Sequence, residues 1–171
     1  MGEGLGRGGS PPMTPTWRFL LAHPAHLVAF GFGAGLAPKA PGTVGTLLGF
    51  PLSWLVATAA PDLINQLALL AAAFIVGIPI CARAGRALGV ADHGGIVWDE
   101  VVAFALVLVF TPAGWLWGAL AFALFRLFDI VKPWPIREFD RRLKNGFGVM
   151  FDDLLAAGYA IAVMKGLTWL G

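Results

Sequence analysis

Long apolar runs alternate with short polar segments along the chain, and this pattern predicts a helical protein. Residues 44–60, 65–82, 101–110, 115–125 and 154–170 contain almost no charge. The first two runs are each about 17 residues long, the short end of what spans a bilayer as a helix. Pro61-Asp62 and Thr111-Pro112-Ala113-Gly114 predict tight turns, and Pro51 predicts a kink in the first helix. The expected fold is therefore an all-α, compact, membrane-associated bundle of short apolar helices.

The first 16 residues differ from the rest of the chain. They are rich in Gly and Pro and offer little to bury, so we expect a disordered tail before a single domain at residues 17–171. Trp17–Phe30 follows as a short amphipathic lead-in that Pro24 interrupts. His23 and His26 are three apart, which is compatible with metal ligation. No other ligand lies nearby in the sequence, so an interfacial role is the preferred interpretation.

Composition supports a membrane protein and excludes other classes. Apolar residues make up 58% of the chain and charged residues 13%, against about 45–50% and about 25% in an ordinary soluble domain. The mean hydropathy is +0.77. A net charge of +2 without a basic, aromatic-rich run argues against nucleic acid as a partner. Cys81 is the one cysteine, inside an apolar run, so we expect a buried thiol and no disulfide framework.

Charge is concentrated in one polar segment. Half of all charged residues lie between Arg126 and Asp153. Lys and Arg side chains there are interspersed with the carboxylates of Asp129, Glu138, Asp140, Asp152 and Asp153. Such a mixture suits a metal-assisted site that acts on an anion. The alternative is a solvated loop.

The same segment carries signals for helix ends. Arg126 and Asp129 are three apart, so they share a face if the preceding helix continues through them. Pro133 disfavours helical conformation at Lys132. Pro135 suits the first turn of a new helix, which we expect to run to about residue 144.

Adjacent carboxylates stand before two of the apolar runs. Asp99 as an N-cap, with Glu100 in the first turn, explains where one pair lies but not why there are two carboxylates. Such a pair is costly unless a cation neutralises it, so we favour metal ligation. Asp152 or Asp153 is expected to cap the last helix, after Asn145-Gly146 has ended the one before.

A glycine-rich stretch lies at residues 31–46 (GFGAGLAPKAPGTVGT). Its Gly and Pro content predicts neither a regular helix nor a strand. Its backbone N–H groups, Lys39 and the hydroxyls of Thr43 and Thr46 could hold a phosphate. It matches neither a Walker motif nor a dinucleotide fingerprint. The alternative is a tight loop capped by Thr.

Topology brings the candidate chemistry to one side. If the chain turns at Asp62 and again near Pro112, the polar segments 31–43, 83–100 and 126–153 share one end. That end holds nine of the twelve Lys and Arg residues. The positive-inside rule then places it in the cytoplasm.

With these motifs in place, the chain resembles the phosphatidylglycerophosphatase A family over roughly residues 30–158. The resemblance is carried by residues 31–47 (GFGAGLAPKAPGTVGTL), 92–100 (DHGGIVWDE), 125–137 (FRLFDIVKPWPIR) and 148–153 (GVMFDD). It implies an all-helical, Mg²⁺-dependent enzyme of the bacterial cytoplasmic (inner) membrane. The implied reaction removes the terminal phosphate of the phospholipid phosphatidylglycerophosphate to give phosphatidylglycerol.

The resemblance also suggests roles for the charged residues, through attack on the phosphomonoester by a water molecule that Mg²⁺ activates. Mg²⁺ ligands or the general base are expected among Asp99, Glu100, Asp129, Asp152 and Asp153. Arg126, Lys132 and Arg137 would hold phosphate oxygens, and Asp140 would orient one of these cations. His93 is a candidate proton donor to the leaving group, with a structural hydrogen bond at a turn as the alternative.

Three positions depart from the family pattern. Ala103 stands where Gly is usual, Asn145-Gly146 replaces Gly-Gly, and Ala156-Ala157 replaces Ala-Gly. The two added methyl groups concern helix packing rather than chemistry. Asn tolerates a left-handed backbone almost as Gly does.

Other functions stay open at this stage. The same site could act on another membrane phosphomonoester or on an isoprenoid diphosphate. A small membrane transporter predicts charges buried mid-helix, whereas here they fall at helix ends and in loops. A structural scaffold leaves the convergence of the carboxylates unexplained. The sequence does not set the oligomeric state.

Overall fold

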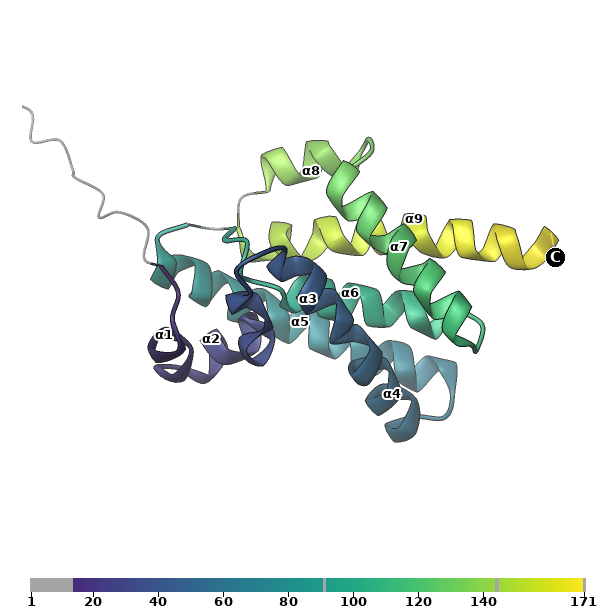
Figure 1. Cartoon of the computed structure of the whole chain (residues 1–171), viewed down its shortest axis with the longest axis horizontal. Coiled ribbons are helices and arrows are strands. Elements are labelled where there is room, and N and C mark those ends of the chain that lie inside the picture. The colour runs from purple at the N-terminus through teal and green to yellow at the C-terminus, as the bar shows by residue number, and fades with distance from the viewer. Residues whose placement is uncertain (1–13, 91, 144, 171) are drawn as a thin grey trace, which may run out of the picture.

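The computed structural model describes residues 14–90, 92–143 and 145–170, so the predicted tail lies outside the described residues except for its last three. Within the described ranges there are helices and no strands, which confirms the all-α prediction (Figure 1). The elements are α1 (Trp17–Leu21), α2 (Pro24–Ala29), the 3₁₀ helix η1 (Gly31–Leu36), α3 (Pro41–Leu47), α4 (Gly49–Ala59), α5 (Leu63–Leu88), α6 (Trp98–Val109), α7 (Trp115–Val131), α8 (Ile136–Arg142) and α9 (Gly146–Leu170).

Helix α6 lies at the centre of the bundle. After its first turn it is apolar on every side, a composition that requires burial all round. It packs against α3, α4, α5, α7 and α9, and the residues from Val101 to Ala105 are all buried. The first turn of α6 is thereby fixed in the interior.

Helix α5 is longer than the apolar run that predicts it. Asp62 caps its start by accepting a hydrogen bond from the Asn65 backbone N–H at 2.9 Å. The helix continues through Arg83 and Arg86, which are exposed, to Gly89, whose φ of 78° ends it. The predicted helix ended too early, at residue 82, because polar residues on the outer face of a helix do not end it.

The glycine-rich stretch is more regular than predicted. It forms η1 and α3, and Leu48 separates α3 from α4. Pro51 lies in the first turn of α4, where its missing N–H is not needed. The prediction of a stretch without helix was wrong because packing allows glycines in a helix: a Cβ at Gly45 would meet Val97 at 2.5 Å, and one at Gly35 would overlap the Gly95 carbonyl.

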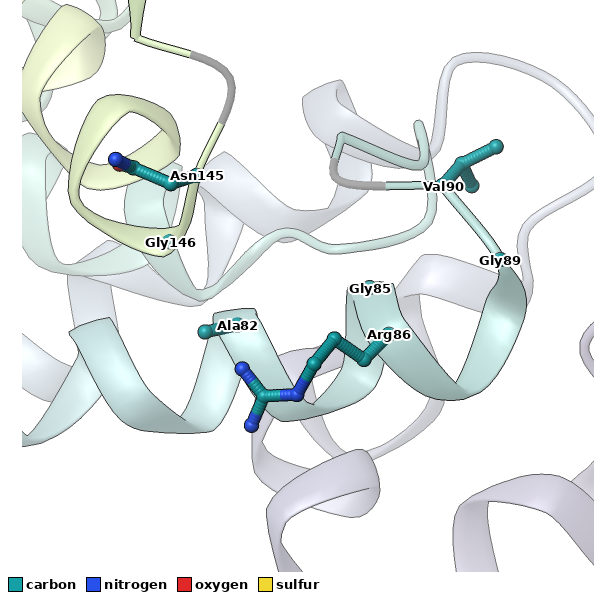
Figure 2. Close-up of a pocket in the computed structure, with 7 residues that line it drawn as sticks. All are labelled: Ala82, Gly85, Arg86, Gly89, Val90, Asn145 and Gly146. Atoms are coloured by element: carbon teal, nitrogen blue, oxygen red, sulfur yellow. The ribbon is translucent and has the colours of Figure 1, made fainter.

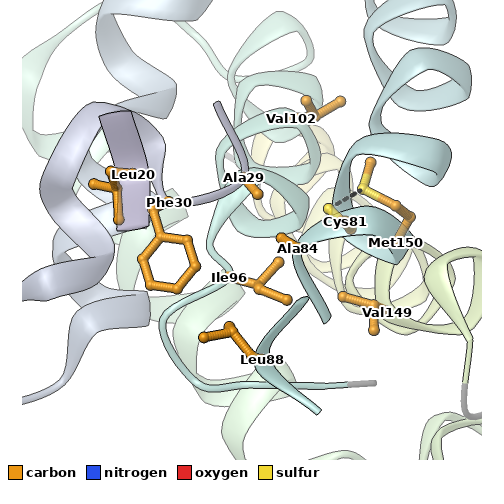
Figure 3. Packing of buried hydrophobic residues seen from close by; sticks show 10 residues of the cluster. All are labelled: Leu20, Ala29, Phe30, Cys81, Ala84, Leu88, Ile96, Val102, Val149 and Met150. Carbon is orange, nitrogen blue, oxygen red and sulfur yellow. Dashed lines mark hydrogen bonds between the residues drawn. The ribbon is translucent and has the colours of Figure 1, made fainter. Parts of the chain in front are cut away.

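Three buried clusters hold the described helices together, and the two larger ones bear on the predictions. The first contains Phe30, Leu88 and Met150, with Cys81, which confirms the buried thiol (Figure 3). The Cys81 thiol donates to the Met150 sulfur at 3.8 Å. The second cluster contains both Ala103 and Ala157. Each of these alanines is at most 3% exposed, so the two extra methyl groups lie in a packed core.

Among the described residues, three segments are long and apolar enough to cross a membrane, namely Pro41–Ala59, Leu63–Leu88 and Gly146–Trp169. Helices α6 and α7 have 12 and 17 residues, fewer than the ~20 that a typical span needs. In Figure 1 the α4–α5 and α6–α7 turns lie at the end where the chain finishes, while α8 and the polar loops lie toward the other end.

Candidate active site

The first turn of α6 presents two carboxylates to the interior. The loop before α6 is fixed by a hydrogen bond of 2.8 Å from the Val97 N–H to the Ala29 carbonyl. The alternative considered above, in which Asp99 is the N-cap, is excluded because Val97 occupies that position and no side chain caps the helix. Asp99 and Glu100 both lie inside the first turn, where the helix dipole favours negative charge.

The second pair of carboxylates comes from α9. The prediction that Asp152 or Asp153 caps this helix was wrong, because α9 begins at Gly146. Asn145 accepts a hydrogen bond from the Gly148 N–H at 2.9 Å, and so takes the capping role. The acidic pair therefore lies in the second turn of the helix, where both residues are at most 6% exposed.

These carboxylates meet in a cavity of about 130 Å³, which we call the acidic cavity. Its lining comes from the loop before α6, from α6, from the end of α7 and from α9. The residues are Asp92, Gly94, Ile96, Asp99, Glu100, Asp129, Lys132, Val149, Asp152 and Asp153. The predicted convergence of the second and third polar segments is thus confirmed.

Three carboxylates in the cavity are arranged like metal ligands. Asp99, Glu100 and Asp153 each offer an oxygen, and these oxygens lie within 4.8 Å of one another. One oxygen of each is buried without a hydrogen-bond partner. Buried, unpaired carboxylate oxygens are costly. An oxygen-only set suits a hard cation such as Mg²⁺ rather than zinc, so these residues fit a metal ion.

Two cations flank this acidic group. Arg126 donates to Asp129 at 2.5 Å and lies 3.4 Å from Glu100 and from the Thr46 hydroxyl. The predicted shared face of Arg126 and Asp129 is confirmed. Thr46 is fully buried, donates to the Gly42 carbonyl at 2.8 Å and does not line the cavity, so its hydroxyl has a structural contact there.

Lys132 is the second cation, and it follows the last residue of α7. Its ammonium group bonds to Asp140 at 3.1 Å and, more closely, to Asp152. Asp140 thus forms an ion pair with one of the cations that it was expected to orient. Burial alone would lower the pKa of Lys132, but Asp152 and Asp140 raise it above its usual range, so this side chain stays charged.

Burial, and after it the nearby negative charge, raises the pKa of the α6 carboxylates. Burial raises the pKa of Glu100 to about 8; the charge of Asp129 adds to the rise and Arg126 opposes it. Burial also raises the pKa of Asp99 well above its usual range, and the charges of Glu100 and Asp152 add to this. A cation bound between them would favour the deprotonated forms.

The other predicted phosphate ligands lie elsewhere. Lys39 is exposed and Thr43 half-buried, and neither lines the acidic cavity. Arg137 is exposed on α8 and lines a neighbouring cavity. His93 Nδ1 accepts a hydrogen bond from the Gly95 N–H at 3.0 Å, which is the turn interaction considered above as the alternative.

Asp92 is a lining residue that sequence reasoning did not select. It was passed over as part of a polar loop. Its place at the head of the 92–100 motif, seven residues before Asp99, was the available signal.

A larger cavity of about 360 Å³ lies between the end of α5 and the start of α9 (Figure 2). It is lined mainly by small residues, and Arg86 is the one charged side chain among its described lining. It shares no described lining residue with the acidic cavity. Although this cavity is larger than the acidic cavity, its described lining lacks the carboxylates of a candidate reactive centre.

The chain matches the family model described as phosphatidylglycerophosphatase A over residues 27–168. A Haemophilus influenzae protein of that name is 47% identical over 151 residues, or 88% of this chain and 92% of that protein. The Escherichia coli protein of the same name is 38% identical over 148 residues, or 86% and 85% of the two chains. A Bacteroides thetaiotaomicron protein named putative phosphatidylinositol-3-phosphatase is 38% identical over 154 residues, or 84% and 93%. No solved structure matches the chain.

Proposed function

The chain belongs to the phosphatidylglycerophosphatase A family, and we propose that it removes the terminal phosphate of phosphatidylglycerophosphate in the acidic cavity, with Mg²⁺ as cofactor. The observation that carries the assignment of the site is the group of three unpaired carboxylate oxygens on Asp99, Glu100 and Asp153. They are the residues that would hold the ion. When bound, it would supply positive charge for phosphate oxygens and lower the pKa of a water molecule.

The remaining charged residues of the cavity have roles of their own. Lys132 places an ammonium group in the wall, where it can bind a phosphate oxygen and stabilise charge that develops on it. Asp129 lines the cavity outside the ligand group and is held by Arg126, which supports a role for it as the base that accepts the proton of the attacking water.

Direct attack by water is favoured over transfer of the phosphoryl group to a Ser, Cys or His side chain. The described residues that line the acidic cavity include no Ser, Cys or His that could act as a nucleophile. In the proposed step, a water oxygen bonds to phosphorus as the phosphorus–oxygen bond to glycerol breaks. The leaving oxygen takes a proton and the products are phosphatidylglycerol and inorganic phosphate.

The test is phosphate release from phosphatidylglycerophosphate in detergent micelles, with Mg²⁺ or with EDTA. We expect Mg²⁺-dependent release that Asp153→Asn lowers about 100-fold or more, because the substitution removes one charge from the ligand group. Asp62→Asn is the matched control, since Asn also caps helices and residue 62 lies at the α4–α5 turn. Full activity in EDTA, or in Asp153→Asn, would overturn the assignment of the site.

A second substrate class rests on one observation. The Bacteroides thetaiotaomicron relative is named for a phosphoinositide, although its identity to this chain equals that of the Escherichia coli protein. The phosphate-release assay should therefore include phosphatidylinositol 3-phosphate. Faster release from it than from phosphatidylglycerophosphate would keep the site and change the substrate.

We also propose that the acidic cavity opens on the cytoplasmic face of the bacterial inner membrane. The candidate membrane segments support a membrane location. The polar segments 31–43, 83–100 and 126–153, two of which line the cavity, contain nine of the twelve Lys and Arg residues of the sequence, and the positive-inside rule favours the cytoplasm for such segments.

A further inference from the structure

A cavity of about 340 Å³ adjoins the acidic cavity, and we call it the basic cavity. It is lined by Val131, Lys132, Pro133, Trp134, Arg137, Glu138 and Arg141. We propose that the basic cavity binds the phosphodiester group of the lipid while the terminal phosphate occupies the acidic cavity. This inference rests on the proposed function, since that substrate carries both a diester and a monoester phosphate.

The charge of the basic cavity suits an anion. Among its described lining residues Glu138 is the one carboxylate, and it is paired at 2.6 Å with Arg142, which is outside the lining. Neither Arg137 nor Arg141 forms an ion pair with any residue that the structure describes, and both are exposed. Two guanidinium groups are therefore available to a phosphodiester, which they bind through charge-assisted hydrogen bonds.

The two cavities share a wall. Lys132 lines both of them, and its ammonium group points to Asp152 on the acidic side. In phosphatidylglycerophosphate a single glycerol joins the diester to the terminal phosphate. A substrate with two phosphates so close together needs two neighbouring anion sites, and this pair of cavities provides them.

An exposed apolar stripe runs along α7 and reaches the basic cavity. It consists of Leu116, Leu120, Leu127, Ile130 and Val131, at helical spacing, followed by Trp134. These side chains are between 37% and 82% exposed. Val131 and Trp134 also line the basic cavity. The stripe suits the acyl chains, so the order of stripe, basic cavity and acidic cavity follows the order of groups in the lipid.

The test compares two substrates that share the leaving glycerol but differ in the diester. These are a monodisperse dibutyroyl phosphatidylglycerophosphate and glycerol 1-phosphate. We expect an Arg137→Gln, Arg141→Gln double variant to raise KM for the short-chain lipid about tenfold or more. The kcat of the double variant for the lipid and its kcat/KM for glycerol 1-phosphate should stay within about twofold of the wild-type values. All of these constants should also stay within about twofold of wild type in a matched control variant on α5, Arg83→Gln, Arg86→Gln.

Equal losses on both substrates would place the two arginines at the terminal phosphate and overturn the proposal. A defect seen only on bilayers, and not with the short-chain lipid, would overturn it in favour of attraction to the membrane surface.

A binding measurement separates this proposal from the proposed reaction. Dibutyroyl phosphatidylglycerol keeps the diester and lacks the terminal phosphate. It should bind the wild-type protein in EDTA about tenfold more tightly than the double variant. Equal binding would overturn the subsite whichever lipid is hydrolysed. Arginine-dependent binding without any turnover would retain the subsite and reject the proposed function.

Discussion

The Glu100 carboxylate has room in the acidic cavity because residue 42 has no side chain. A Cβ at Gly42 would overlap Glu100 Oε1 and lie 3.3 Å from the Arg126 guanidinium. We expect Gly42→Ala to displace Glu100 and lower kcat about tenfold or more. Overpacking should also lower the free energy of unfolding by about 1–3 kcal/mol. Phosphate release and denaturant unfolding in detergent measure the two effects.

The matched control is Gly158→Ala, because a Cβ at that exposed position of α9 would meet nothing within 4 Å. It should leave kcat unchanged and stabilise the helix by about 0.5–1 kcal/mol. Unchanged turnover in Gly42→Ala would show that the position of Glu100 does not matter to the reaction.

The raised pKa of Glu100 predicts how stability depends on pH. In the folded protein this carboxyl titrates at about 8, against 4.5 for its ordinary value. The folded state therefore binds more protons than the unfolded chain between these pH values. Without a divalent cation, the free energy of unfolding should fall as pH rises through this window. Asp99 adds to the effect in the same direction.

Melting temperatures in EDTA and in Mg²⁺, measured across this pH range, would check the dependence. Mg²⁺ should raise the melting temperature most at the alkaline end, where the ligands are deprotonated. Glu100→Gln should flatten the curve in EDTA. A melting temperature that rises with pH in EDTA would contradict the predicted proton binding.

Among the elements, turns were easier to predict than helix ends. Pro61-Asp62 and residues 111–114 lie between helices as predicted, and Pro133 follows the end of α7 closely. The ends of α5 and the start of α9 were missed because polar residues were taken as boundaries. Asp152 and Asp153 lie within α9, where their charged side chains line the acidic cavity.

The candidate site was predictable in its residue types but not in their partners. The sequence places Asp99 and Glu100 next to each other, yet only the packing of α6 against α9 brings Asp153 to them. The division of cations between two cavities depends on where α8 lies, which no local pattern sets. The assignment of Lys39 and Thr43 to phosphate stays a prediction.

The start of α9 offers a test at the scale of a helix. Asn145→Ala removes the hydrogen bond to the Gly148 N–H and should lower the free energy of unfolding by about 1 kcal/mol. Asn145→Asp keeps an acceptor and should restore most of it. Asp152 and Asp153 are almost two turns further along the helix, so the loss of the cap should not displace them. At a temperature where the protein is folded, the activity of Asn145→Ala should fall less than threefold, in proportion to the fraction of unfolded protein. Equal stability of both variants would contradict the capping role.

For the molecule as a whole, the orientation in the membrane is the testable quantity. Ala59 is exposed beside the α4–α5 turn, and Arg86 is exposed near the opposite end of α5. In spheroplasts, a membrane-impermeant maleimide should label Ala59→Cys, and should label Arg86→Cys only after permeabilisation. The native Cys81 is fully buried and serves as an unreactive background. The reverse labelling pattern would place the acidic cavity on the outer face.

The close approach of the glycine-rich stretch to the loop before α6 has a consequence for how the chain accepts change. Gly31, Gly35, Gly42 and Gly45 all face neighbours that leave no space for a methyl group. The outer faces of α5 and α7 require only that a side chain be apolar. Tolerance to substitution should therefore follow the closeness of packing: the short glycine-rich stretch admits almost no variation, and the outer faces of the long helices admit a great deal.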